Sequence, residues 1–567
     1  ERPFYFEFSV NEKVAAEVAF GAAIDGRTSC VFFKSVGLNV AADSFVQFPL
    51  MDISGGMVVL LGDDPGANSS QNEQDNRHYA ELSYMPLYEP ANAQEAYEMF
   101  KDAVKEARSR RCAVIVRMTT HVCHAKEKIS FGPLPEIQAA AGEPFAPGAE
   151  GYIPIAASVF PLKRRALERL RAFAAFADAS PFTRFDDNGN HKRGIITAGT
   201  AYMSLLDVIA DVGAKPDILK LGIPFPLPEA AVLEFLRSHE EVKILEELDP
   251  VLEKAIKALA YEHGLSTRIR GKESVDERIG EYVPDKVHDI LSSLWPDLLG
   301  KRPKPAEAAV GARPPQLCPG CGHRSAFHAI RQALSKEDIS VADIGCHTLG
   351  FLPPYKMGSV LLSMGHSTST ASGLALAGGK RNVVSFLGDS TFFHAGLPGI
   401  INAVYNKHTV TLIIMENGTT AMTGHQDHPG TGNNFSEVTE KLSIRAVLEA
   451  LGVSYIREVD TYQQAKLTAL VKEALEAPGF KVIIARHPCM LKFTKEARRK
   501  EGWKEKHVFV NKTTCTKAHV CISNFGCPSF QFREEGAVEV QNELCIGDGS
   551  CRQTCPSSAI EPEGGIK

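Results

Sequence analysis

The sequence predicts an α/β protein of three parallel-sheet domains, followed by a small α+β domain of a different kind. Its 567 residues allow three to five domains at about 100 to 200 residues each. Helix-period segments alternate with short apolar runs along most of the chain, which is typical of βαβ units. The last 60 or so residues break this alternation and contain six of the 13 cysteines.

The composition is that of a globular protein and makes nucleic acid and membranes poor candidate partners. Hydrophobic residues make up 44% and charged residues 23%, and the formal net charge is −6. Nucleic-acid binding needs a basic patch, and no apolar run approaches the roughly 18 residues that cross a bilayer. We therefore expect a cytoplasmic protein. The chain begins at Glu1 with a strand-like stretch, FYFEFSV, so we expect part of the natural N-terminus to be missing.

The first two α/β domains can be followed segment by segment. In the first, the pattern predicts helices at 11–26 and 93–110 and buried strands at 28–34, 56–63 and 112–118. A segment rich in Ala, Gly and Pro (139–154) and a basic helix (162–176) lead to the second, with strands at 194–199 and 242–248. That domain ends near residue 300, and the proline-rich, charged segment 301–316 is predicted to be a linker.

The third α/β domain contains a candidate metal site. Its strands are expected at 339–345, 382–389, 409–417, 453–459 and 481–487. Asp389 and Asn417 end two successive strands, so both reach the carboxyl edge of the sheet, where α/β proteins bind ligands. A carboxylate, an amide oxygen, a backbone carbonyl and phosphate oxygens suit Mg²⁺, and a helix starting near Ala395 would offer N–H groups to the phosphates. A Gly-Asp pair with a distant Asn also occurs by chance, but the placement on two strands favours the metal site.

Four cysteines of the third domain form a candidate metal-binding set, which we call the proximal set: Cys318, Cys321, Cys346 and Cys489. Three of these positions lie at strand edges and can converge beside the Asp389 site. Four thiolates suit either tetrahedral zinc or a [4Fe–4S] cluster, and the spacing alone does not decide between them. Cys30, Cys112 and Cys123 stand alone at the edges of apolar strands and are expected to be small buried hydrophobic residues.

Several motifs resemble one enzyme family. The segments CPGCGHRSAFHAI (318–330), DIGCHTLG (343–350), GDSTFFHAGLPGIINAVYNKH (388–408) and MENGTTAMTG (415–424) are similar to the thiamine domain of 2-oxoacid:ferredoxin oxidoreductases. The segments VNEKVAAEVAFGAAI, KSVGLNVAAD and DDPGANSSQNEQDNRHYA resemble the large (alpha) subunit of the indolepyruvate type. The match covers nearly the whole chain, although Ser390 stands where the family motif GDG has its second Gly and the upstream substrate loop of the family is absent.

The resemblance implies a domain order. A pyrimidine-binding thiamine domain (1–140), a linker segment (141–190) and a transketolase C-terminal-like domain (191–300) precede the linker 301–316. A diphosphate- and Mg²⁺-binding thiamine domain with a proximal cluster (317–500) and a ferredoxin-like two-cluster domain (507–567) follow it.

The resemblance also implies roles for individual residues. Gly388, Asp389, Ser390, Asn417, Thr419 and His323 bind thiamine diphosphate, with Asp389, Asn417 and the Thr419 carbonyl as Mg²⁺ ligands. Glu12 faces the pyrimidine nitrogen and promotes deprotonation of the thiazolium C2, a role that burial of the carboxyl would support. Spacing alone equally allows a solvated Glu12 that interacts with the helix dipole. For the proximal set, the resemblance favours a [4Fe–4S] cluster over zinc.

The C-terminal domain resembles a two-cluster ferredoxin with one cysteine missing from each half. In such ferredoxins each half carries four cysteines at the spacing C-x2-C-x2-C-x3-C. The last Cys of each half ligates the cluster of the other half. Crossed ligation gives one set of Cys515, Cys521 and Cys555 (the Cys515 set) and another of Cys527, Cys545, Cys551 and Asp548 (the Cys545 set). Ala518 and Asp548 occupy the second slots, so we expect a [3Fe–4S] centre at the Cys515 set unless His519 or an external group ligates it. A decayed domain without clusters is the alternative.

The activity implied is oxidative decarboxylation of an aryl 2-oxoacid, such as indolepyruvate or phenylpyruvate, to the acyl-CoA. Coenzyme A is then a co-substrate, ferredoxin accepts the electrons, and a smaller subunit joins a hetero-oligomer with a dimeric core. Three alternatives stay open: a non-oxidative thiamine-dependent decarboxylase, a non-catalytic electron-transfer subunit, and an oxidoreductase for a non-aromatic 2-oxoacid. The cysteine sets argue against the first of these, because it needs no clusters.

Overall fold

The computed structural model describes residues 4–133, 142–146, 151–300, 302, 315–377, 381–503 and 506–563. It divides into two compact units, which we describe separately: an N-terminal unit (Asn11–Ala308) and a C-terminal unit (Glu1–Val10 with Ala309–Lys567). The predicted linker 301–316 lies mostly outside the described residues. Among the helices described, none is long and apolar enough to cross a membrane.

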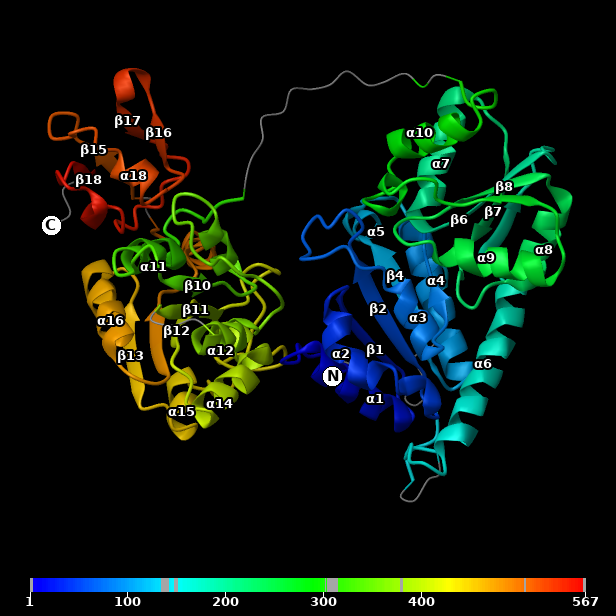
Figure 1. Cartoon of the computed structure of the whole chain (residues 1–567), viewed down its shortest axis with the longest axis horizontal. Helices are drawn as coiled ribbons and strands as arrows, with labels where there is room; N and C mark the ends of the chain where they lie inside the picture. The colour runs from blue at the N-terminus through cyan, green and yellow to red at the C-terminus, as the bar shows by residue number, and fades with distance from the viewer. Residues whose placement is uncertain are drawn as a thin grey trace. The chain divides into compact units, whose positions relative to one another are not determined.

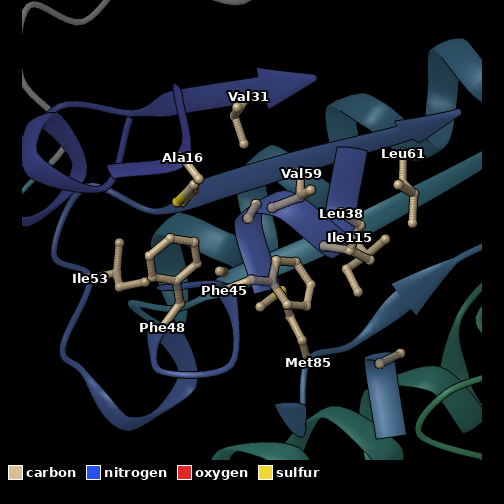
Figure 2. Close-up of a cluster of buried hydrophobic side chains, with 14 of the residues drawn as sticks. Ala16, Val31, Leu38, Phe45, Phe48, Ile53, Val59, Leu61, Met85 and Ile115 are labelled. Atoms are coloured by element: carbon tan, nitrogen blue, oxygen red, sulfur yellow. The ribbon is translucent and has the colours of Figure 1, made fainter. Parts of the chain in front are cut away.

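The first sheet of the N-terminal unit is parallel, with strand order β1-β2-β4-β3 (Figure 1). Its strands are β1 (Ser29–Lys34), β2 (Met57–Asp63), β3 (Leu87–Tyr88) and β4 (Ala113–Thr119). The helices around it are α1 (Glu12–Ile24), α2 (Gly37–Phe45), α3 (Arg77–Ser83), α4 (Ala93–Ser109) and α5 (Thr120–His124). Figure 2 shows one of its cores, where Ala16 and Phe45 from the helices pack with Val59 and Ile115 from the sheet. The predicted helices and strands of this domain are all present, within two residues at each end.

The second sheet of the N-terminal unit has the order β5-β7-β6-β8-β9. Its strands are β5 (Thr183–Asp186), β6 (Arg193–Ala198), β7 (Asp217–Leu221), β8 (Glu241–Leu245) and β9 (Arg268–Arg270). Its helices are α6 (Val159–Ala179), α7 (Gly199–Val212), α8 (Glu229–Ser238), α9 (Val251–Glu262) and α10 (Pro284–Leu294). The sheet departs from the predicted all-parallel arrangement, because the edge strand β5 runs antiparallel to β7.

Buried ion pairs join the two sheets of the N-terminal unit. Arg77, on α3 of the first domain, pairs with Asp75 and with Glu246 of the second domain, each at 2.6 Å. Its guanidinium also donates to the carbonyl oxygens of Glu247 and Asp249, at 2.7 and 2.9 Å. Arg77 is only 3% exposed, so these contacts satisfy a charge that water does not reach.

We expect Arg77→Met to lower the free energy of unfolding of the N-terminal unit by about 3–5 kcal/mol, because it leaves two buried carboxylates without their partner. Urea denaturation of the full chain measures the loss. Arg278→Met is the matched control, since its ion pair with Asp249 is half-exposed and such pairs contribute about 0–1 kcal/mol. Equal losses in the two variants would contradict a central role for the buried pair.

The sheet of the C-terminal unit is parallel, with order β10-β11-β12-β14-β13. Its strands are β10 (Ile339–Val341), β11 (Val383–Gly388), β12 (Thr411–Glu416), β13 (Tyr455–Asp460) and β14 (Lys481–Arg486). Its helices are α11 (Gly322–Arg331), α12 (Ser367–Ala377), α13 (Asp389–Thr391), α14 (Leu397–Tyr405), α15 (Ile444–Ala450), α16 (Gln464–Glu476) and α17 (Met490–Ala497). Successive strand residues serve opposite faces: Ile413 packs with α11 and α16, and Leu412 with α12, α14 and α15.

A small domain of short antiparallel ladders ends the chain (Figure 1). In it β15 (Val508–Val510) pairs with β18 (Ile560–Pro562), and β16 (Phe530–Phe532) pairs with β17 (Val538–Val540). One short helix, α18 (Val520–Ser523), accompanies them. This is the α+β domain that the change of pattern predicts.

Of the three isolated cysteines, only Cys112 is buried, so the expectation was wrong for Cys30 and Cys123. Cys30 lies on the edge strand β1, where alternate side chains face solvent. Cys123 lies on the short helix α5, whose only buried residue is Val122.

Candidate functional site

Asp389 lies where β11 meets the helix that follows. β11 ends at Gly388, and Asp389 is the first residue of α13. A π-helical segment, Phe392–Gly396, connects α13 to α14 without a break. The helix therefore begins at Asp389 and not near Ala395 as predicted, and its first N–H groups belong to residues next to the carboxylate.

The Asp389 carboxylate joins the ends of two strands. Its Oδ2 accepts hydrogen bonds from the N–H groups of Asn417 and Gly418, at 3.0 and 2.7 Å, just after β12. Its Oδ1 accepts one from the Ser390 N–H at 2.9 Å. A carboxylate offers about four lone-pair directions, so Oδ1 retains one for a metal ion. The residue is 2% exposed, and the donor set suits a hard cation.

Asn417 lies beside this carboxylate, as its position after β12 predicts, and Thr419 is bonded to Asn417. The Asn417 side-chain oxygen accepts a hydrogen bond from the Thr419 N–H at 3.1 Å, which orients the amide. Ser390 accepts one from the Thr420 hydroxyl at 2.9 Å, so the turn after β11 is bonded to the loop after β12. Thr419 is 1% exposed.

His428 is a neighbour of Asp389 that the sequence did not indicate. Its Nδ1 accepts a hydrogen bond from the Gly430 N–H at 3.2 Å, so the ring proton is on Nε2. Nε2 lies 3.3 Å from Asp389 Oδ2, but the angle is not that of a hydrogen bond. The contact is therefore electrostatic. Only the fold brings this loop to the site, so no local signal could have found it.

Two buried histidines connect this edge of the sheet to the cysteines. The rings of His323 and His347 stack with centroids 6.1 Å apart. Burial lowers the pKa of His323 to about 4, against the opposing charge of Asp389, and the pKa of His347 to about 3. A Cβ added to Gly388 would lie 3.3 Å from the His347 ring. His347 Nε2 is buried without a hydrogen-bond partner among the described residues, as expected of a group that meets a polar ligand.

The four thiols of the proximal set gather at the same edge. Cys346 lies beyond β10, Cys489 three residues after β14, and Cys321 at the N-cap of α11. The pKa of Cys346 is raised to about 12, mainly by burial and further by the charges of the other three thiols. The backbone N–H of Cys489 donates to the Asn417 carbonyl at 2.9 Å, so the thiol set and the Asp389 site share a hydrogen bond. His323 Nδ1 lies 3.5 Å from the Cys321 sulfur.

The ferredoxin-like cysteines are in electrostatic contact within each of the two expected sets. Burial raises the pKa of Cys521 to about 11, and Cys555 and Cys515 add to it. Burial also raises the pKa of Cys551, helped by Asp548, Cys527 and Cys545. A small cavity of about 10 Å³ is lined by all four members of the Cys545 set. Across the described ranges, no three His, Cys, Asp or Glu side chains are close enough to hold a single metal ion, so the ligand sets remain predictions.

Ala518 and Asp548, which replace the second cysteine of each half, are both flanked by residues in the left-handed conformation. Lys517 and His519, on either side of Ala518, have φ values of 56° and 57°. Gly547 and Gly549, on either side of Asp548, have φ values of 66° and 74°. Non-glycine residues rarely adopt this conformation, and His519 is held in it by a contact of its Nε2 with the Gly536 carbonyl at 2.8 Å. The residues on either side of Ala518 thus share the left-handed backbone conformation of those on either side of Asp548.

The Cys545 set adjoins the proximal set within the C-terminal unit. A Cβ on Gly320, between Cys318 and Cys321, would lie 3.2 Å from the Asp548 carboxylate. The Tyr462 hydroxyl donates to the Gly320 carbonyl at 2.7 Å, and the Gln464 amide to the Ser550 carbonyl at 3.2 Å. The residues just before and after Cys515, by contrast, are exposed. The Cys545 set therefore lies next to the proximal set, whereas the residues on either side of Cys515 face solvent.

Glu12 belongs to the N-terminal unit and opens α1, after the Asn11 cap. It is partly buried, so it is neither the fully solvated nor the fully buried carboxyl that the two interpretations assumed. Its side chain lies against the start of α2, where a Cβ on Gly37 would come within 2.7 Å of Glu12 Oε1. Gly37 thus leaves room for the carboxylate in its observed position.

Comparison with known proteins identifies the family. A sequence profile described as thiamine pyrophosphate enzyme, C-terminal TPP binding domain, matches residues 343–485. Indolepyruvate oxidoreductase subunit IorA of Methanothermobacter marburgensis is 40% identical, over 99% of this chain and 90% of its own length. This chain belongs to the IorA family. The IorA of Pyrococcus abyssi is 36% identical, over 98% of this chain and 90% of its own length.

A more distant relative of this IorA-family chain is 2-oxoglutarate synthase subunit KorB of Methanothermobacter marburgensis. It is 26% identical over 32% of this chain and 68% of its own length. Membership of the IorA family and the matched profile confirm the predicted family, an oxidoreductase subunit and a thiamine diphosphate-binding domain. The profile spans Asp389 and Asn417 and the two strands that they follow.

Proposed function

We propose that this chain is the thiamine-binding subunit of an enzyme that oxidatively decarboxylates an aryl 2-oxoacid to its acyl-CoA. The substrate is of the indolepyruvate or phenylpyruvate type, and ferredoxin takes the electrons. A smaller subunit completes a hetero-oligomer, in keeping with relatives that are named as subunits. Thiamine diphosphate, Mg²⁺ and iron–sulfur clusters are the resident cofactors.

One observation supports the proposal most directly. The proximal set and the proposed Mg²⁺ ligands lie at the same edge of the sheet in the C-terminal unit. The Cys489 N–H donates to the carbonyl of Asn417, a proposed Mg²⁺ ligand, at 2.9 Å. A thiamine enzyme that passes no electrons has no use for a thiol set in this position. When bound, thiamine diphosphate supplies a carbanion for attack on the 2-oxoacid carbonyl, and iron–sulfur clusters take up electrons singly.

The residues of this chain have distinct proposed tasks. Asp389 Oδ1, the Asn417 amide oxygen and the Thr419 carbonyl hold the metal ion, while Gly388 and Ser390 shape the turn against the diphosphate. His323 lies between this site and Cys321, and Glu12 holds the proton exchanged with the pyrimidine nitrogen. The proximal set, the Cys545 set and the Cys515 set hold three clusters in a series that ends at the Cys515 set.

Anaerobic purification of the chain together with its smaller subunit tests the proposal. Iron, sulfide and thiamine are counted, and reduction of a viologen dye is followed with indolepyruvate, phenylpyruvate or 2-oxoglutarate, with and without coenzyme A. We expect dye reduction with the aryl acids that depends on coenzyme A and yields the acyl-CoA. Aldehyde release without dye reduction would instead identify a non-oxidative decarboxylase, and a preference for 2-oxoglutarate would reject the aryl substrate.

The nuclearity of the Cys515 set gives a separate prediction. We expect a [3Fe–4S] centre there, because Ala518 has no donor atom and His519 Nε2 is engaged by the Gly536 carbonyl. Ala518→Cys should convert it to [4Fe–4S] and shift its reduction potential, since ligand number and exposure set that potential. The residues on either side of Ala518 share the left-handed conformation of those on either side of Asp548, so we expect the loop to accept the new thiol.

Electron paramagnetic resonance of the oxidised protein measures this outcome, because an oxidised three-iron centre is paramagnetic. Thr516→Cys, two residues earlier in the same exposed loop, is the control for adding a thiol without filling the slot. A wild-type protein with no three-iron signal and four irons per cluster would show that Nδ1 of His519, water or a partner group completes the site.

A further inference from the structure

Arg324 is a buried cation between the proximal set and the Cys545 set. It lies on the first turn of α11, three residues after Cys321, and its side chain is among the largest that are fully buried. Its Nη2 donates to the carbonyls of Leu317 and of Cys318, the latter at 3.1 Å. One guanidinium edge thus holds the loop that begins the proximal set.

The second terminal nitrogen of the guanidinium, Nη1, bonds to the ferredoxin-like domain. Nη1 donates to the carbonyls of Gly526 and Phe525, the residues just before Cys527 of the Cys545 set. Tyr355 completes the arrangement: its hydroxyl accepts from Nη1 at 3.2 Å and donates to the Phe525 carbonyl at 2.6 Å. Two nitrogens of one side chain therefore connect the chain segments that carry two ligand sets.

Among the described residues, no carboxylate forms an ion pair with Arg324. All of its hydrogen-bond partners are carbonyl or hydroxyl oxygens, and Nε is buried without a partner. A buried charge without compensation is costly, so a negative group should lie nearby. The sulfur atoms of Cys318 and Cys321 on one side and of Cys527 on the other are in electrostatic contact with it.

We propose that Arg324 is the shared counter-charge of the proximal set and the Cys545 set, and that it raises the reduction potential of the clusters they hold. The inference rests on the proposed function, because it requires clusters at both sets. Reduction adds negative charge to a cluster, and a fixed cation in a region of low dielectric favours the more negative state. One residue thereby raises the potentials of two neighbouring centres together. We class it as a positioning residue, because its proposed action is on the clusters and not on the reacting atoms.

Redox titration of the complete, anaerobically purified protein, followed by electron paramagnetic resonance, tests the proposal. In Arg324→Gln we expect both clusters to be harder to reduce: the reduced-to-oxidised ratio at fixed potential should fall at least tenfold, about 59 mV for a one-electron couple. The centre at the Cys515 set should not shift. Arg324→Lys, which keeps the charge but not the fork, should shift far less. Arg331→Gln, which neutralises an exposed arginine on the same helix, is the matched control.

Each outcome decides the matter. Unchanged potentials in Arg324→Gln with full iron content would overturn the proposal, as would equal shifts in the lysine and glutamine variants. If the glutamine variant loses iron, retention of clusters in the lysine variant supports a requirement for charge, whereas loss in both shows that shape alone matters. A wild-type protein without iron would instead reject the proposed function itself.

Discussion

Asp389→Ala is expected to abolish Mg²⁺-dependent binding of thiamine diphosphate. The substitution removes the charged side-chain ligand proposed for the metal ion. Even changes to groups behind metal ligands cost about 10–100-fold in affinity, so we expect at least about 100-fold weaker binding. Calorimetric titration with thiamine diphosphate, with and without Mg²⁺, measures the effect.

The structure supplies a control for this variant. Removing the carboxylate also leaves the Asn417 and Gly418 N–H groups without their acceptor, which costs about 1–3 kcal/mol for each buried group. Asp338 accepts the Ser335 and Asn382 N–H groups near the opposite ends of β10 and β11. Asp338→Ala should therefore perturb the same sheet and leave cofactor affinity unchanged. Equal affinities in the two variants would remove Asp389 from the site.

Glu12→Gln is expected to leave the cofactor bound and to slow exchange at its C2 carbon by about 10²–10⁴-fold. An amide has the size of the carboxyl but cannot supply the proton that the pyrimidine nitrogen needs. Hydrogen–deuterium exchange of bound thiamine diphosphate, quenched in acid and read by nuclear magnetic resonance, gives the rate. Wild-type exchange in this variant would assign Glu12 a structural role only.

Two further variants sharpen the Glu12 test. Glu17→Gln alters a carboxylate of the same helix that pairs with Lys13 at the surface, so exchange should be unaffected. Gly37→Ala places a methyl group within 2.7 Å of Glu12 Oε1 and displaces the carboxylate without changing its chemistry. We expect Gly37→Ala to slow exchange as well, because the proton would be held in the wrong place.

The periodicity of the sequence predicted most of the fold, and its failures have local causes. The strand β7 was missed because Asp217 and Lys220 interrupt its apolar run, although all five residues are buried. Asp217 is compensated by His239 at 3.1 Å and Lys220 by Glu95 at 2.6 Å. Partners so far away in sequence leave no mark on the local pattern.

The helix after β11 shows a second limit of predicting structure from the sequence pattern. Pro398 indicates a helix start nearby, since proline favours the first turn. The π-helical segment Phe392–Gly396 lies directly before it and carries the helix from Asp389 through to Tyr405. Such segments are rare and have no reliable sequence signature.

The site residues that directly follow strands could be predicted from the sequence. Those that reach the site through loops could not. Asp389 and Asn417 follow neighbouring strands, so strand order alone brings them together. His428 reaches Asp389 through a loop of irregular conformation, and His347 meets Gly388 only because the segment after β10 turns beneath it. Arg324 lies three residues after Cys321 in the sequence, but its burial could not be predicted. A charged residue in the first turn of a helix is usually exposed to solvent.

The ion pairs of Arg77 should contribute to joint unfolding of the two domains of the N-terminal unit. Domains built on different sheets often unfold in separate transitions. Here the buried Arg77 of the first domain pairs with Asp75 of its own domain and with Glu246 of the second. If either domain unfolded alone, the other would keep a buried charge without its partner. Scanning calorimetry should therefore record one cooperative heat-absorption peak for residues 11–308, and neither domain should be obtainable as a stable excised fragment.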